Sequence, residues 1–198
     1  MGDYPFCVIV VIISPMNKMQ NKMTFRHWAK DRIAIRDRYT FADSAKVIAQ
    51  LQHIIDTYNP DSILFYLPMP HEVDVSKLLK KERKRRSIYV PFMVGDSFKM
   101  VAYRQPLREG RFKIREPRDS RRNIKHVDMI IVPILGMDKT YRRIGFGKGM
   151  YDRFYERLKT KPLVIFLQTT LCYTSSVITD DYDIKADYVI TPKKTMKI

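Results

Sequence analysis

Apolar positions along the chain follow two different spacings, and each spacing predicts a different kind of element. Between residues 47 and 58 apolar side chains recur every three or four positions, which predicts an amphipathic helix capped by Asp43 and ended by Asn59-Pro60. Short uninterrupted apolar runs predict buried strands instead. Three further helices are expected over residues 22–38, 73–86 and 149–159. The expected strands cover residues 62–67, 88–94, 98–103, 129–135, 163–167 and 188–191, and residues 193–197 are typical of a solvated tail.

The alternation of these helices and strands predicts the fold class. A Gly95-Asp96 turn between two expected strands indicates one antiparallel hairpin. Elsewhere helices separate the strands, which favours a mostly parallel sheet with helices on both faces. We therefore expect a single three-layer α/β domain of Rossmann-like type. In such sheets ligands bind beyond the carboxyl ends of the strands.

The most informative segment follows the strand expected at residues 129–135. It reads Arg143-Ile144-Gly145-Phe146-Gly147-Lys148-Gly149 and leads into an expected helix. Alternate glycines allow positive φ and let successive amides point into one concavity, while the helix start adds unpaired N–H groups. Arg143 and Lys148 add full positive charges, and Asp152 is placed to hold Mg²⁺. The pattern predicts a phosphate site that is neither a Walker A loop nor G-x-G-x-x-G; a surface turn with incidental charge is the alternative.

Composition narrows the class of protein. The 198 residues contain 45% apolar side chains, which excludes intrinsic disorder, and 37 basic against 21 acidic residues give a net charge of +16. Only two cysteines are present, which excludes a disulfide framework or a Cys-based zinc site and favours a reducing, cytoplasmic location. The apolar run at residues 6–13 is too short to span a bilayer. We interpret residues 1–15 as an extension, from an upstream start or as an additional strand.

The segment from Met137 to Asp152 resembles the signature of the 5-formyltetrahydrofolate cyclo-ligases, also called methenyltetrahydrofolate synthetases. That signature is roughly F-D-x-x-G-x-R-L-G-x-G-x-G-Y-Y-D. Further matching segments follow the family order from about residue 18 to the end: Lys22-x-x-x-Arg26, residues 66–73, Arg115-Glu116-Pro117, Gln168 and Asp183-x-x-x-Asp187. Two positions depart from the pattern, because Tyr141 replaces a glycine and Met150 replaces the first tyrosine of Y-Y-D.

The resemblance implies a domain over residues 16–198 with a fold like that of NagB, RpiA and the CoA transferases. It implies ATP- and Mg²⁺-dependent cyclisation of 5-formyltetrahydrofolate to 5,10-methenyltetrahydrofolate through a phosphorylated formyl group, with Arg143 and Lys148 catalytic. The residues expected to bind ATP are Lys22, Arg26, Arg143, Ile144, Gly145, Phe146, Gly147, Lys148, Gly149, Met150 and Tyr151. The folate is expected to contact Leu67, Glu72, Phe146 and Met150, and Mg²⁺ is expected at Asp152 and Asp183.

Two other functions remain open. Basic runs at residues 80–86 and 104–122 are compatible with a nucleic-acid-binding α/β protein, although no RNP motif, zinc finger or recognition helix accompanies them. Tyr141 and Met150 are compatible with an ATP-binding homologue that has lost catalysis. We favour the enzyme, as a monomer without nucleic-acid or membrane partners, and expect part of the basic surplus to steer polyglutamylated folates.

Overall fold

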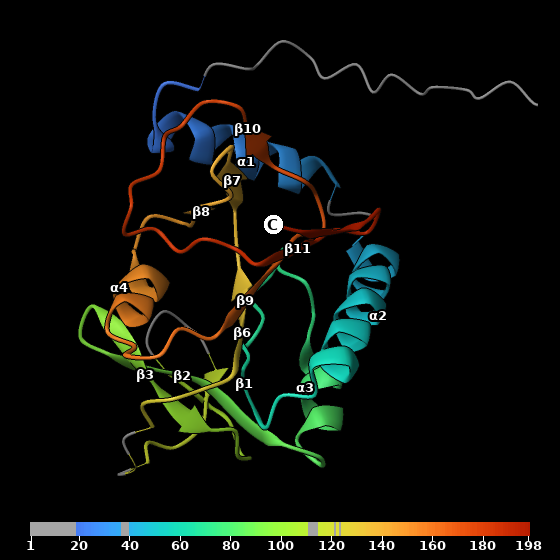
Figure 1. The fold of residues 1–198 in the computed structure, drawn as a ribbon, viewed down its shortest axis with the longest axis vertical. Helices are drawn as coiled ribbons and strands as arrows, with labels where there is room; N and C mark the ends of the chain where they lie inside the picture. The colour runs from blue at the N-terminus through green and yellow to red at the C-terminus, as the bar shows by residue number, and fades with distance from the viewer. Residues whose placement is uncertain (1–18, 37–39, 111–114, 121, 123) are drawn as a thin grey trace, which may run out of the picture.

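The computed structural model describes residues 19–36, 40–110, 115–120, 122 and 124–198, and is built around a seven-stranded sheet (Figure 1). The strand order is β12-β11-β9-β6-β1-β2-β3. Neighbouring strands run parallel except at the two edges, where β3 and β12 are antiparallel to their partners. The strands are β1 (Ser62–Leu64), β2 (Ser87–Val94), β3 (Ser97–Ala102), β6 (Met129–Pro133), β9 (Leu163–Leu167), β11 (Tyr188–Ile190) and β12 (Thr195–Lys197). The predicted mostly parallel sheet and its hairpin are confirmed.

Helices cover both faces of this sheet, as predicted. Helices α2 (Thr40–Tyr58) and α3 (Ser76–Glu82) pack on one face, where Leu51 and Leu79 join the same buried cluster as strand residues such as Ile131. Helix α4 (Met150–Glu156) packs on the other face through Phe154 (Figure 1). The central strands are buried on both faces, which explains their continuous apolar runs.

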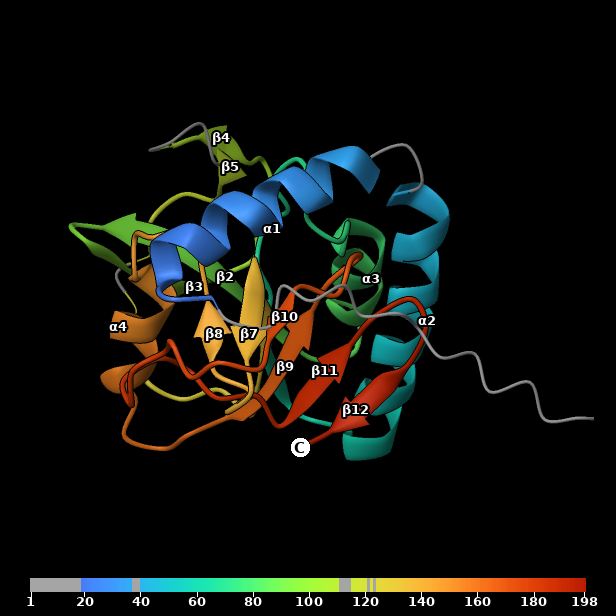
Figure 2. The same ribbon diagram turned by 90° about the horizontal axis from the view of Figure 1, so that it is seen from above.

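Helix α1 (Lys22–Arg36) crosses the top of the sheet, beyond the carboxyl ends of its strands (Figure 2). Phe25 and Ala29 are fully buried there, in a cluster with Leu135, Ile144 and Cys172. This apolar anchoring leaves the adjacent face of the helix, which carries Lys22 and Arg26 near its start, beside the glycine loop. The helix therefore forms one wall of the ligand region.

Two small sheets lie beyond the main one. Strands β10 (Tyr173–Thr174), β7 (Gly136–Asp138) and β8 (Arg143–Ile144) form a three-stranded sheet, and β4 (Arg108–Glu109) pairs with β5 (Arg115–Glu116). The sequence analysis assigned no strand between residues 135 and 143, but this segment forms most of a β7–β8 hairpin. Gly136 is required there, because a Cβ would lie 2.4 Å from the buried Phe25 ring.

Several predicted boundaries were wrong. The expected helix over 73–86 spans only Ser76–Glu82, because the Asp74 carboxylate accepts the Ser76 N–H (2.9 Å) and starts the helix later. Helix α2 begins at Thr40, so Asp43 lies inside its first turn and is not its cap. The expected tail at 193–197 contains β12. This strand pairs with β11 and so supplies hydrogen-bond partners for the outer side of β11. Residues 1–15 lie outside the described residues, and within the described part no helix has the length and apolarity needed to cross a bilayer.

Candidate active site

Three adjoining cavities lie at the carboxyl edge of the sheet. The first, here called the polar cavity, has a volume of about 330 Å³ between α1, the glycine loop and residues 180–183. The central cavity, of about 240 Å³, lies between β1, β2 and the start of α4. The α1 cavity, of about 300 Å³, lies under α1 at the ends of β6 and β9. The central cavity shares Arg143, Lys148 and Gly149 with the polar cavity, and Glu72, Pro133 and Phe146 with the α1 cavity.

The polar cavity concentrates charge around the glycine loop. Its basic side chains are Lys22, Arg26, Arg143, Lys148 and Arg153, and its acidic ones are Asp152, Glu156, Asp180 and Asp183. Gly147 (φ 108°) and Gly149 (φ 60°) both occupy the left-handed region, where an L side chain would be strained. The Arg26 Nε donates to the Gly145 carbonyl (2.8 Å), which ties the loop to α1.

Arg143 lies at the boundary between the polar and central cavities. Its guanidinium is buried, donates to the Pro133 carbonyl (3.2 Å) and pairs with the Asp152 carboxylate (3.1 Å). The charge also lies 5.1 Å from the centre of the Tyr151 ring. A Cβ on Gly145 would come within 2.4 Å of the Arg143 Nη1, so this glycine is needed for the position of Arg143. The arginine is therefore held rigidly where the two cavities meet.

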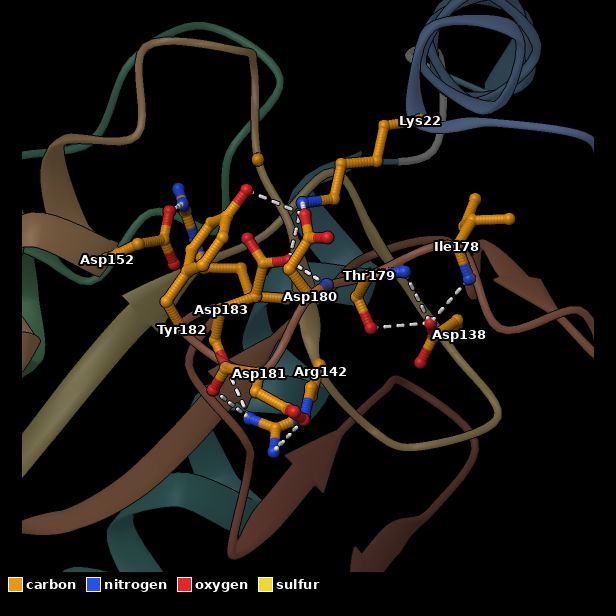
Figure 3. Close-up of polar contacts among 12 residues, drawn as sticks. Lys22, Asp138, Arg142, Asp152, Ile178, Thr179, Asp180, Asp181, Tyr182 and Asp183 are labelled. Atoms are coloured by element: carbon orange, nitrogen blue, oxygen red, sulfur yellow. Dashed lines mark hydrogen bonds and ion pairs between the residues drawn. The ribbon is translucent and has the colours of Figure 1, made fainter.

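Lys22 faces the acidic segment at the opposite side of the polar cavity (Figure 3). Its Nζ lies 2.6 Å from Asp180 Oδ2 and 2.5 Å from Asp183 Oδ2. Burial alone would lower the pKa of Lys22, but the two ion pairs outweigh burial and raise the pKa above its ordinary value. The Tyr182 hydroxyl donates to Asp180 (2.7 Å), and the Tyr182 ring lies 5.2 Å below the Lys22 ammonium.

Asp138 and Arg142 hold that acidic segment in place (Figure 3). The Asp138 side chain is fully buried and accepts the Ile178 and Thr179 N–H groups at 3.0 and 2.9 Å. Burial opposes ionisation of Asp138, but its hydrogen bonds prevail and lower its pKa. Arg142 donates to the carbonyls of Asp181 and Asp183, both at 2.8 Å. Asp183 is thus positioned by main-chain and side-chain contacts that no local sequence pattern encodes.

The central cavity is apolar except for Glu72 and the cations at its polar end. Glu72 Oε2 accepts the Met69 N–H (2.9 Å), whereas Glu72 Oε1 is buried and has no hydrogen-bond partner among the described residues. Burial raises the pKa of Glu72 to about 7, against smaller lowering effects of the Met69 hydrogen bond and the Arg143 charge. Burial likewise raises the pKa of Tyr151, whose ring packs edge-on against Phe98.

The structure brings together most of the residues predicted to form the site, but in two groups. Lys22, Arg26, the glycines, Asp152 and Asp183 line the polar cavity. Leu67, Glu72, Phe146, Met150 and Tyr151 line the central cavity together with Arg143 and Lys148, so the three expected ATP ligands Phe146, Met150 and Tyr151 do not line the polar cavity. The Ile144 side chain faces neither cavity, because it is buried beside Phe25 and Leu135.

Four residues that line the polar cavity were not predicted as site residues from the sequence: Arg153, Glu156, Asp180 and Tyr182. Arg153 belongs to α4 and donates to the Lys148 carbonyl (2.5 Å), and Glu156 follows one turn later. The clustering of acids at residues 180–183 was the one available signal for Asp180. Nothing in the sequence distinguished Tyr182 from other exposed aromatic residues.

The basic run at residues 80–86 lies away from all three cavities. It ends immediately before the amino end of β2, at the sheet edge opposite to them. Arg86 forms an ion pair with the buried Glu82 (2.7 Å) and donates a hydrogen bond to the Pro60 carbonyl. Arg83 stacks over the Tyr103 ring. The steering of folate tails therefore stays a prediction only for the basic segment 104–122.

Fold and site together define an α/β protein with a cation-lined glycine loop beside an apolar cavity. The chain belongs to the 5-formyltetrahydrofolate cyclo-ligase family, whose model matches residues 17–192. The 5-formyltetrahydrofolate cyclo-ligase of Escherichia coli K12 is 27% identical over 154 residues, covering 70% of this chain and 84% of that protein. The Mus musculus protein of the same name is 27% identical over 172 residues, covering 78% and 83%.

Solved structures agree with this membership. The NMR structure of Aquifex aeolicus 5,10-methenyltetrahydrofolate synthetase matches with a TM-score of 0.75 and 26% identity, and the match covers 89% of this chain and 92% of that one. The predicted enzyme class and fold are confirmed. The boundary at residue 16, the monomeric state and the cytoplasmic location stay predictions.

Proposed function

We propose that the chain converts 5-formyltetrahydrofolate to 5,10-methenyltetrahydrofolate with hydrolysis of ATP to ADP and phosphate. Family membership supports the cyclisation. The observation that carries the proposal is the junction at Arg143, Lys148 and Gly149, where a cation-lined cavity joins an apolar one. A triphosphate in the first and a folate in the second would meet at that junction.

The chemistry explains why two such cavities are needed. The formyl group is an amide, and its oxygen is a poor leaving group. Transfer of the γ-phosphoryl group to that oxygen activates the formyl carbon, N10 then attacks the carbon, and phosphate departs with the C–O electron pair. Phosphoryl transfer depends mainly on positioning and charge stabilisation. Arg143 and Lys148 line both cavities, which supports assigning to them the stabilisation of that charge.

The polar cavity suits the phosphates of ATP. The positive φ values of Gly147 and Gly149 turn the backbone of the loop toward a concave arrangement, and no Cβ obstructs its approach to a ligand. Arg26 lies against Gly147 from α1, within 3.8 Å of the position that a Cβ would take there. Lys22 stands across the same cavity. We assign these residues, with Arg143 and Lys148, to the triphosphate.

The donors of the polar cavity also fit Mg²⁺. Within the residues that the structure describes, no three His, Cys, Asp or Glu side chains form a group that could hold a metal alone. Mg²⁺ is usually bound by one or two carboxylates together with substrate phosphates and water. Asp152 and Asp183 line the cavity and would hold it. When bound, Mg²⁺ would neutralise charge on the phosphate oxygens.

The test combines two measurements on the full chain. Absorbance of the methenyl product is followed with ATP, Mg²⁺ and 5-formyltetrahydrofolate, and calorimetry measures binding of ATP with Mg²⁺. We expect ATP binding together with ATP-dependent product formation. ATP binding without product would overturn the proposal in favour of a homologue without catalysis. That alternative comes from the departures from the family pattern, of which Tyr141 is one; it adopts a left-handed φ of 59° where the pattern has glycine.

A further inference from the structure

Glu72 occupies a distinctive place between the two apolar cavities. The residues common to the central and α1 cavities are Glu72, Pro133 and Phe146, and Glu72 alone among them can titrate. A ligand with two ring systems, one in each cavity, would place its connecting atoms against this shared wall. If the proposed function holds, such a ligand is the folate, in which N5, its formyl group and N10 connect the pterin to the aminobenzoyl ring. The reacting atoms would then lie beside Glu72.

Ring closure releases a proton that needs an acceptor. The new bond joins N10 to the formyl carbon, and the N10–H bond breaks with its electron pair remaining on nitrogen. Phosphate leaves with the electron pair of the C–O bond. We propose that Glu72 Oε1 is the general base that accepts the N10 proton during this step. The carboxylic acid that results then loses its proton to solvent after the product departs.

The local geometry suits Glu72 to this role. The Met69 N–H fixes Oε2 at 2.9 Å, while the buried Oε1 has no hydrogen-bond partner within the described ranges. One oxygen is thus anchored and the other remains for a ligand. A general base works best when its pKa lies near the operating pH, and burial raises the pKa of Glu72 to about 7.

The other titratable and charged groups around these cavities serve less well. Arg143 and Lys148 are cations at the polar end of the central cavity, and Lys30 is a cation of the α1 cavity. The phenols of Tyr66 and Tyr151 have pKa values that burial raises, so they do not ionise near neutral pH, and Tyr66 donates to the Val73 carbonyl (2.6 Å). His71 lines the α1 cavity and is absent from the wall shared with the central cavity.

Glu72→Gln tests the proposal, because glutamine keeps the shape and an acceptor for Met69 but cannot take up the proton. We expect single-turnover product formation to fall at least about 100-fold, while the dissociation constant for 5-formyltetrahydrofolate without ATP changes less than about threefold. In the wild-type enzyme the rate should rise about tenfold per pH unit below about pH 7 and then level off. The variant should lose this dependence.

Asp74→Asn is the matched control, since Asp74 is an exposed carboxylate two residues away that lines none of the cavities. It should retain the wild-type rate and pH profile. A Glu72→Gln variant with the wild-type rate, or one that loses only folate affinity, would overturn the assignment of the base. A wild-type rate that does not rise with pH toward pH 7 would also overturn this assignment. Absence of product from the wild-type enzyme would instead overturn the proposed function, and the base with it.

Discussion

The buried carboxyl group of Glu72 should reduce the stability of the fold at neutral pH, and Glu72→Gln should restore it. The folded-state pKa is raised from 4.5 to about 7, so between those values the folded chain binds more protons than the unfolded chain. Stability therefore falls as the pH rises through this interval. The shift of about 2.5 units corresponds to about 3 kcal/mol, as an upper value, at 1.36 kcal/mol per unit.

Urea unfolding of both proteins at pH 4.5 and pH 8 measures this effect. At pH 4.5 much of the Glu72 carboxyl is neutral in either state, and the two proteins should have nearly equal free energies of unfolding. At pH 8 the variant should be more stable by up to about 3 kcal/mol, or about 6–12 °C in Tm for a chain of this size. Other titrating groups cancel in the comparison. An equal difference at both pH values would refute the reasoning, because Glu72 would then not be the source.

Four further substitutions test the remaining geometry. Lys148→Ala should lower kcat at least about 100-fold with an unchanged urea midpoint, because this side chain is exposed; full activity would remove its assigned role. Asp152→Ala should cost about 3 kcal/mol of stability by leaving the buried Arg143 unpaired, and an unchanged urea midpoint would contradict this. Gly145→Ala should displace Arg143 and lower turnover at least about tenfold, so wild-type kinetics would exclude the close contact. Tyr141→Gly should be more stable than Tyr141→Ala by about 1 kcal/mol, since both lose the ring and only glycine relieves the left-handed backbone; equal urea midpoints would argue against strain.

The buried Glu72 carboxyl is expected to affect both the stability of the fold and the rate of the reaction. A carboxyl group buried without a full set of partners costs stability, and such groups occur where function needs them. The expected outcome for Glu72→Gln is a more stable protein with a slower reaction. A single variant would therefore show that the fold tolerates an unfavourable group at the wall between the two cavities.

The two departures from the family pattern have different structural consequences. Tyr141 adopts a φ of 59°, which explains why the pattern has glycine there. The chain accepts this backbone because the Tyr141 N–H bonds to the Asp138 carbonyl (2.9 Å) and the ring packs against the core. Met150 lines the central cavity and packs against the same core cluster, so its thioether occupies space beside the folate region.

Local sequence patterns were sufficient for the α/β class, the hairpin at Gly95 and the glycine loop, because helix period, strand burial and glycine geometry are properties of neighbouring residues. They were insufficient for β12, which forms only as an extension of the assembled sheet at β11, and for the β7–β8 hairpin, where Gly136 packs against the distant Phe25. The division of the site was also decided by tertiary structure. Phe146 and Lys148 are two positions apart in one loop and both line the central cavity, yet only Phe146 also lines the α1 cavity and only Lys148 also lines the polar cavity. The contacts of that loop with Arg26 of α1 and Arg153 of α4 determine which side chain faces which cavity.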